Sequence, residues 1–206
     1  MELTTTYDFS KLLKVLPIKI SKTRNRPNVS GGDPEFIKRH RLDNKGNRLD
    51  YNRERYKINK RYPSYGNRVE SITLGVVKQI FKKNGGYVPS KLNLKYPELY
   101  MELSLAIDSI DPDFKWDSCT INHNTKCLKH RDGRNVGKSI IVAMGDYIGG
   151  NLKVYDEEDV NYISYDIKNK PLKFNGSLLS HETEDFIGDR WSFVWYSKIK
   201  SVFEYD

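Results

Sequence analysis

The chain has 206 residues, of which 37% are hydrophobic, 12% aromatic and 30% charged. This length suits one domain with a peripheral extension, and the aromatic content argues against wholesale disorder because aromatic side chains supply much of a core's buried area. Lys and Arg number 35 against 27 Asp and Glu, and the net charge of +8 favours polyanionic partners. Two cysteines, Cys119 and Cys127, argue against a disulfide framework and favour a reducing compartment.

The N-terminal residues lack the basic start and the long apolar region of a secretory signal. No stretch approaches 18 apolar residues, so we expect no membrane-spanning segment. The expected location is intracellular, cytoplasmic or nuclear, and the protein is not expected to be secreted.

The positive charge is concentrated near the N-terminus. Between Lys11 and Arg68 there are 17 Lys and Arg residues against 5 Asp and Glu residues, a local net charge of +12. Apolar periodicity is weak there and resumes near Ser71. We therefore expect a basic, partly irregular extension over residues 1–70 and a folded domain over residues 71–206.

Within the extension, residues 21–34 predict a loop, and Asp33 followed by Pro34 predicts the start of a short helix toward Arg41. Residues 41–62 interleave tyrosines with arginines and lysines, a pattern that can bind phosphates and stack bases. The alternative for this segment is a solvated, partly disordered arm.

The second part begins with an expected strand over residues 71–81 and a helix that opens at Pro97 and ends near Pro112. The helix places its apolar residues at helical spacing, namely Leu99, Leu103, Ala106, Ile107 and Ile110. Strands are then expected over residues 118–124, 138–147, 151–156, 160–167, 171–176 and 190–198. The turns expected between them are Asp132-Gly133, Gly149-Gly150 (a hairpin turn), Asn169–Pro171 and Gly188-Asp189. Many short strands after a helix predict a mainly β, jelly-roll barrel with helical support.

Two of the four histidines lie in a pattern with chemical meaning. His130 and Asp132 are two residues apart, so an extended strand would place both side chains on one side. His181, on a later β-segment, would supply a third ligand. Two histidines and one carboxylate on one face of an ion are typical of non-haem Fe(II) oxygenases. The structural alternatives are a surface pair for His130 and Asp132, and a turn capped by His181.

An iron with an open face needs a source of electrons, and a chelating 2-oxo acid is one. Arg190 follows His181 by nine positions, and its planar guanidinium suits a carboxylate. Ser192 would point the same way along the final strand and donate a second hydrogen bond.

With these residues in view, the stretch 122–196 resembles the core of Fe(II)- and 2-oxoglutarate-dependent oxygenases, and within that superfamily it is most similar to the TET/JBP group of nucleic-acid base dioxygenases. The resemblance rests on the run His-Arg-Asp-x-x-Asn, the later His181 and the Arg-x-Ser of the last strand. It implies a double-stranded β-helix (cupin-like) and the use of Fe(II), 2-oxoglutarate and dioxygen, with ascorbate as an accessory reductant. It also implies that Asn135 contacts a thymine or 5-methylcytosine base whose methyl group is oxidised. From the first core strand, Asn122 and Asn124 either reach the 2-oxoglutarate or bond to the backbone of a turn.

Two other functions fit parts of the pattern. The short spacing between His181 and Arg190 is closer to that of prolyl hydroxylases, which favours a protein hydroxylase. A non-catalytic, nucleic-acid-binding β-barrel would need only the basic charge. A second set of residues could instead form a zinc site, namely Cys119, His123, Cys127 and His130. The other interpretation of this set is that both cysteines pack in the core.

Overall fold

The computed structural model describes residues 1–17, 20, 29–30, 70–78 and 86–198. Of the loop expected at residues 21–34, only residues 29–30 are described. The short helix expected toward Arg41 and the basic, tyrosine-rich stretch 41–62 lie outside the described residues.

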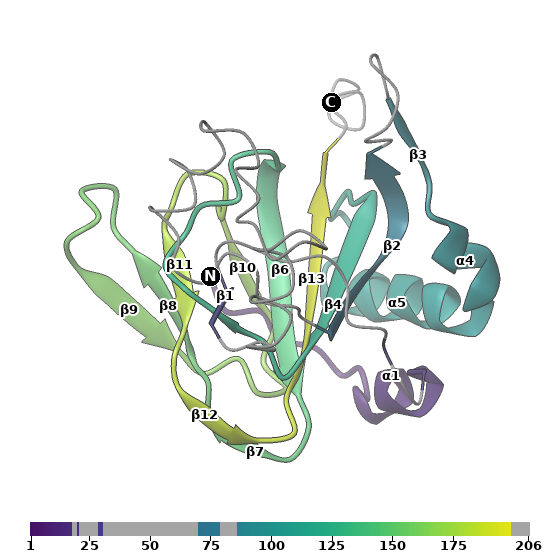
Figure 1. Cartoon of the computed structure of the whole chain (residues 1–206), viewed down its shortest axis with the longest axis horizontal. Helices are drawn as coiled ribbons and strands as arrows, with labels where there is room; N and C mark the ends of the chain where they lie inside the picture. The colour runs from purple at the N-terminus through teal and green to yellow at the C-terminus, as the bar shows by residue number, and fades with distance from the viewer. Residues whose placement is uncertain (18–19, 21–28, 31–69, 79–85, 199–206) are drawn as a thin grey trace, which may run out of the picture.

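A six-stranded antiparallel sheet forms the centre of the molecule (Figure 1). Its outer strands are short, whereas its central strands pair along most of their length. In spatial order the strands are β10 (Leu172–Phe174), β6 (Val136–Met144), β13 (Trp191–Ser197), β4 (Ser118–His123), β2 (Glu70–Lys78) and β3 (Tyr87–Pro89).

Within the described residues, three smaller antiparallel units accompany the central sheet. The largest of them, a three-stranded sheet, lies on the side of the central sheet opposite the helices (Figure 1). It contains β11 (His181–Thr183), β8 (Leu152–Tyr155) and β9 (Tyr162–Tyr165). The two-stranded units pair β12 (Phe186–Gly188) with β7 (Tyr147–Gly149), and β1 (Val29–Ser30) with β5 (Lys126–Cys127).

Helices cover one side of the central sheet (Figure 1). They are α1 (Ser10–Val15), α4 (Lys91–Lys95) and α5 (Pro97–Ile110). The expected helix is confirmed as α5: Pro97 occupies the first turn, where its missing N–H costs nothing, and the five apolar residues at helical spacing are all buried. Phe9 and Leu12, from the segment expected to be an extension, join the same core.

Strand alternation divides the interior into two cores. Between the central sheet and the helices lies an apolar core that includes Ile121, Phe193 and Trp195, which are fully buried. Between the central sheet and the smaller sheet lies a second core, which includes Leu152 and Phe174. The described part of the fold is therefore mainly β and antiparallel, as the strand pattern predicted.

The six strands expected after residue 118 are all present, and β2 ends at Lys78 within the described residues. The expected hairpin turn at Gly149-Gly150 is wrong. β7 ends at Gly149 and pairs with β12, whereas β8 pairs with β9 and β11, so the chain changes sheets at the two glycines. Gly149 has a φ of +79°, and a Cβ there would lie 2.4 Å from the backbone oxygen of Asp185. The glycines thus permit a close strand approach.

None of the helices in the described part of the chain has the length and apolar character that crossing a bilayer requires.

Candidate metal centre

The backbone brings His130 and His181 face to face. The N–H of His130 donates to the carbonyl of His181 at 3.0 Å, and the N–H of His181 donates back at 2.9 Å. The expected strand through His130 and Asp132 is only an isolated bridge, because the N–H of Asp132 turns away to the carbonyl of Gly176 at 2.7 Å. Both side chains nevertheless lie on the side of His181.

Three side chains converge at this bridge. Nε2 of His130 lies 3.7 Å from Oδ1 of Asp132, and Nε2 of His181 lies 3.7 Å from Oδ2 of the same carboxylate. The three ligand atoms all lie within 4.8 Å of one another. Since nitrogen and oxygen ligands bind a transition metal at about 2.0–2.2 Å, one ion fits between these atoms. Within the described ranges, no other group of three such residues has this geometry.

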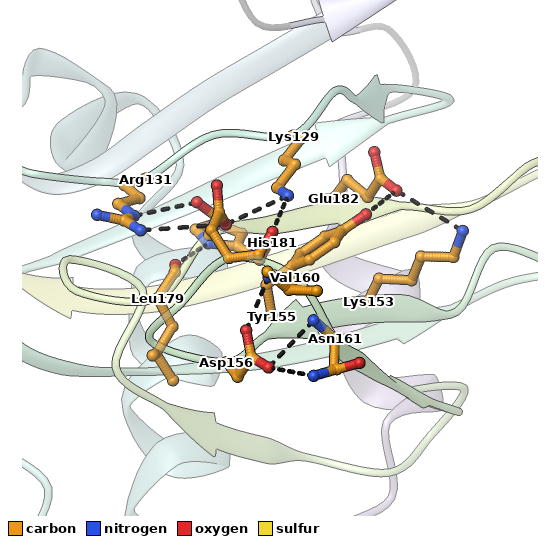
Figure 2. Close-up of polar contacts among 12 residues, drawn as sticks. Lys129, Arg131, Lys153, Tyr155, Asp156, Val160, Asn161, Leu179, His181 and Glu182 are labelled. Carbon is orange, nitrogen blue, oxygen red and sulfur yellow. Dashed lines mark hydrogen bonds and ion pairs between the residues drawn. The ribbon is translucent and has the colours of Figure 1, made fainter.

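Backbone carbonyls orient both imidazoles. Nδ1 of His130 lies 2.6 Å from the carbonyl of Leu128, and Nδ1 of His181 lies 3.1 Å from the carbonyl of Leu179, a contact drawn in Figure 2. Because a carbonyl only accepts, each Nδ1 carries the proton, and the lone pair of each Nε2 is left for a metal. Burial, and then the neighbouring His130, hold the pKa of His181 below its ordinary value, so its imidazole is neutral at pH 7.

A cavity of about 310 Å³ opens from the three ligands. The cavity lies between the central sheet and the smaller sheet and includes the expected site residues Asn122, Asn135 and Ser192. Its remaining lining residues are Thr120, Cys127, Ile141, Leu152, Phe174, Thr183, Val194, Tyr196 and Lys198.

Asn122 and Ser192 form a polar pair on the cavity wall. They lie opposite each other on β4 and β13, and Nδ2 of Asn122 is 3.5 Å from Oγ of Ser192. Oδ1 of Asn122 is buried without a hydrogen-bond partner. A buried amide oxygen without a partner is costly, which indicates that a ligand completes this pair.

Arg190 does not line the cavity, but it lies on the same face of the sheet as Ser192. Its side chain is 2% exposed, and one terminal nitrogen donates to the carbonyl of Gly150 at 3.1 Å. Its guanidinium carbon lies 5.4 Å from the ring centroid of Tyr147 and 5.3 Å from that of Phe186. Nε of Arg190 is buried without a partner, and burial lowers the pKa of the guanidinium. Such a buried cation favours an anionic ligand.

Asn124 fixes the backbone of Arg190. Its N–H donates to the carbonyl of Arg190 at 2.8 Å, and its Oδ1 accepts from the N–H of Arg190 at 2.7 Å. Asn124 adopts a φ of +45°, a conformation that asparagine tolerates better than most residues. The sequence left the role of Asn124 open between a 2-oxoglutarate contact and the bonding of turn backbone, and the structure supports backbone bonding.

The four residues of the alternative zinc site do not converge on one point. His123 is held between Glu70 and Asp189, with Nδ1 and Nε2 at 2.6 Å and 2.5 Å from their carboxylates. Cys119 is buried in the helix-side core, as expected for packing. Cys127 instead lines the cavity, so core packing is the wrong interpretation for this second cysteine.

Two neighbours of His181 were missed by sequence reasoning. The ring of Phe174 packs edge-on to the imidazole at 5.0 Å between centroids. A Cβ on Gly176 would lie 3.2 Å from Cε1 of His181 and 3.0 Å from the ring of Phe174, so only glycine fits there without displacement. The pair Asn175-Gly176 carries a turn signal in the sequence, but a turn signal does not say which side chain packs on it.

No family model matches the sequence, and no curated protein matches it significantly. Among solved structures, the chain is similar to NgTET1 in complex with 5mC DNA, with 10% identity and a TM-score of 0.48 over 84% of this chain and 71% of that chain. It is also similar to a 2OG-Fe(II) oxygenase family oxidoreductase from Burkholderia pseudomallei, with 14% identity and a TM-score of 0.42 over 64% and 68% of the two chains. A prolyl-4-hydroxylase from Pseudomonas putida matches with 15% identity and a TM-score of 0.36, over 64% and 72%.

Of these three proteins, the one from Burkholderia pseudomallei is described as a member of the 2OG-Fe(II) oxygenase family. At this level of identity the neighbours do not distinguish a nucleic-acid substrate from a protein substrate.

Proposed function

We propose that the chain is an Fe(II)- and 2-oxoglutarate-dependent dioxygenase, with a double-stranded β-helix domain over residues 71–206 and a basic extension over residues 1–70. The observation that carries the proposal is the convergence of His130, Asp132 and His181 at one end of a cavity. Two imidazoles and one carboxylate on one side of an ion leave the opposite positions open for co-substrate and dioxygen.

The donor set fits Fe(II) better than structural zinc. Structural zinc sites are closed by four protein ligands, usually including cysteine thiolates. In the part of the chain that the structure describes, the group has three members and no fourth His, Cys, Asp or Glu joins it. Each Nδ1 is hydrogen-bonded to a backbone carbonyl, so both histidines already have the tautomer with a free Nε2 lone pair before a metal binds.

The residues beyond the metal centre fit 2-oxoglutarate. Arg190 pairs with its distal carboxylate, since the guanidinium is buried and Nε has no partner. Ser192 donates a second hydrogen bond, and the Asn122 amide completes the polar wall. The rings of Tyr147 and Phe186 exclude water from the guanidinium, which strengthens its attraction for an anion. When bound, Fe(II) and 2-oxoglutarate supply the activation of dioxygen that oxidises a C–H bond, with ascorbate as accessory reductant.

For the substrate we propose the methyl group of thymine or 5-methylcytosine in nucleic acid. Asn135 shares the cavity with the metal ligands, and its N–H donates to the carbonyl of Asp132 at 2.8 Å, which fixes its distance from the ligands. An amide can pair with the polar edge of a base, and a base in a duplex must be flipped out to enter such a cavity. The charge of the segment between Lys11 and Arg68 favours a polyanionic substrate.

The test of the chemistry is succinate release by the full chain with Fe(II), 2-oxoglutarate and substrate, in air and under nitrogen. Release that requires oxygen and is lost in Asp132→Ala supports the proposal. Release that is unchanged in Asp132→Ala removes it.

The test of the substrate is mass spectrometry of DNA, RNA and protein after incubation with the active enzyme. A gain of oxygen on a base supports the nucleobase substrate. A gain of oxygen on a prolyl or other side chain instead supports a protein hydroxylase, which the nine-residue spacing of His181 and Arg190 favours. Nucleic-acid binding without iron uptake would leave only the non-catalytic barrel.

A further inference from the structure

Polar contacts also connect side chains on the outer side of the metal centre, away from the cavity (Figure 2). His130 and His181 point inward, and neighbours along an extended chain point the opposite way. The side chains next to the two histidines therefore meet on the outside, and those that interact there are Lys129, Arg131, Ser180 and Glu182.

Asp159 contacts three of these four side chains. Nζ of Lys129 lies 3.2 Å from Oδ1 of Asp159 and donates to its backbone carbonyl at 3.0 Å. A terminal nitrogen of Arg131 lies 4.0 Å from the same Oδ1. The Ser180 hydroxyl, and then the Lys129 ammonium, hold the pKa of the Asp159 carboxyl below its ordinary value. Nε of Arg131 also donates to Oγ of Ser180 at 3.0 Å, which links the two histidine-bearing segments directly.

Asp159 lies in a hydrogen-bonded turn between β8 and β9. Asp156 begins the turn between β8 and β9, and its carboxylate accepts from the N–H groups of Val160 at 2.9 Å and Asn161 at 3.0 Å (Figure 2). Asp159 has a φ of +65°, which aspartate and asparagine tolerate better than other non-glycine residues. The turn therefore fixes the backbone of Asp159, and its exposed carboxylate lies beside Lys129 and Arg131.

A second line of contacts runs from the first histidine segment to the second. Nζ of Lys129 lies over the ring of Tyr155 at 3.5 Å from its centroid. The Tyr155 hydroxyl donates to Glu182 at 2.8 Å, and Nζ of Lys153 lies 3.6 Å from the same carboxylate (Figure 2). The two lines share Lys129, so the outer network is continuous from the segment of His130 to the segment of His181.

We propose that Asp159 is a positioning residue, which sets the spacing and orientation of the two paired imidazoles through the three side chains that it contacts. The inference rests on the proposed function, because it concerns how a metal ion is held. On the inner side, the two backbone hydrogen bonds of an isolated bridge join the two histidines. In this proposal the outer charge network holds the two segments at a fixed angle, which keeps both Nε2 atoms directed at one point.

The test is metal affinity measured with Co(II), a divalent ion that binds such nitrogen and oxygen ligands and whose absorption bands report ligand geometry. Asp159→Asn removes the charge and keeps a residue that tolerates the positive φ. We expect its Kd for Co(II) to rise about fivefold, the upper scale for the loss of an exposed ion pair, with altered absorption bands. The matched control is Asp166→Asn, which removes an exposed carboxylate paired with Lys170 at 2.7 Å, away from the metal centre.

Thermal unfolding of the metal-free variants is measured alongside. A raised Kd in Asp159→Asn, with Asp166→Asn within twofold of wild type, supports the inference. An unchanged Kd in Asp159→Asn, or an equal rise in both variants, overturns it. Should Asp159→Asn fail to fold, Arg131→Gln removes one of the same contacts and carries the same expectation. Wild-type protein that binds no Co(II) would overturn the proposed function itself, which separates the two failures.

A double-mutant comparison tests the route of the effect. If Asp159 acts through Arg131, Asp159→Asn combined with Arg131→Gln raises the Kd by less than the product of the two single effects. Independent, multiplying effects would overturn the proposed route.

Discussion

The two faces of the central sheet are built from the same strands and differ in chemistry. The face under the helices carries large apolar side chains such as Phe193 and Trp195, which are both fully buried. The face toward the smaller sheet carries polar side chains on the alternate positions of the same strands, among them Thr120, Asn122, Ser192 and Tyr196. Alternation thus lets one set of strands build a stable core and a ligand cavity.

The comparison predicts that changes on the helix-covered face reduce stability most. Phe193→Ala is expected to lower the free energy of unfolding by about 3–5 kcal/mol, because a buried aromatic side chain leaves a cavity. Urea denaturation measures the loss. Leu105→Ala, on the exposed side of α5, is the control and is expected to change stability by less than about 0.5 kcal/mol. A similar loss in both variants would show that this face is not the main source of stability.

Changes on the cavity face are expected to reduce ligand affinity instead. His130→Ala removes one of three metal ligands and should weaken Fe(II) or Co(II) binding more than about 100-fold, which corresponds to about 3 kcal/mol. Calorimetric titration measures the affinity. His123→Gln, a histidine paired with carboxylates outside the cluster, should leave metal affinity within about twofold. Equal losses in both variants would contradict the assignment of the ligands.

A change at Arg190, the proposed partner of the distal carboxylate, should weaken 2-oxoglutarate binding without weakening metal binding. Arg190→Met keeps much of the side-chain volume and removes the charge, and should raise the 2-oxoglutarate concentration needed for half-maximal succinate release about 10- to 100-fold. Its affinity for Co(II) should stay near that of wild type. Lys170→Met removes an exposed cation far from the cavity and is the control. An unchanged 2-oxoglutarate requirement in Arg190→Met would exclude Arg190 as the carboxylate partner.

The smallest expected effect lies at the turn beside His181. Gly176→Ala places a methyl group against the His181 and Phe174 rings and should weaken metal binding by several-fold, since the imidazole must shift by a few tenths of an ångström. Gly133→Ala is a close control, because it follows a metal ligand and a Cβ there meets no atom within 4 Å. If Gly133→Ala weakens binding as much as Gly176→Ala, crowding of His181 is not the cause.

Much of the local structure could be predicted because its signals are local. Pro97 followed by apolar residues at helical spacing predicts α5, and the β-branched and aromatic runs predict the longer strands. The short strands β7 and β12 were not predicted, because three residues contain too little periodicity. The hairpin prediction at Gly149-Gly150 was wrong for a related reason: glycines show that the backbone turns or approaches another chain, not which strand it then joins.

The sequence alone gives His130, Asp132, His181, Arg190 and Ser192 as candidates, because residue chemistry, the His-x-Asp and Arg-x-Ser spacings and their order along the chain are properties of the sequence. Only the tertiary structure decided that His130 and His181 lie opposite each other, that Arg190 is buried behind the cavity, and that Asp159 joins the outer sides of the histidine segments. These contacts depend on strand pairing between distant parts of the chain. Pairing is decided by which faces bury together, and no local pattern contains that information.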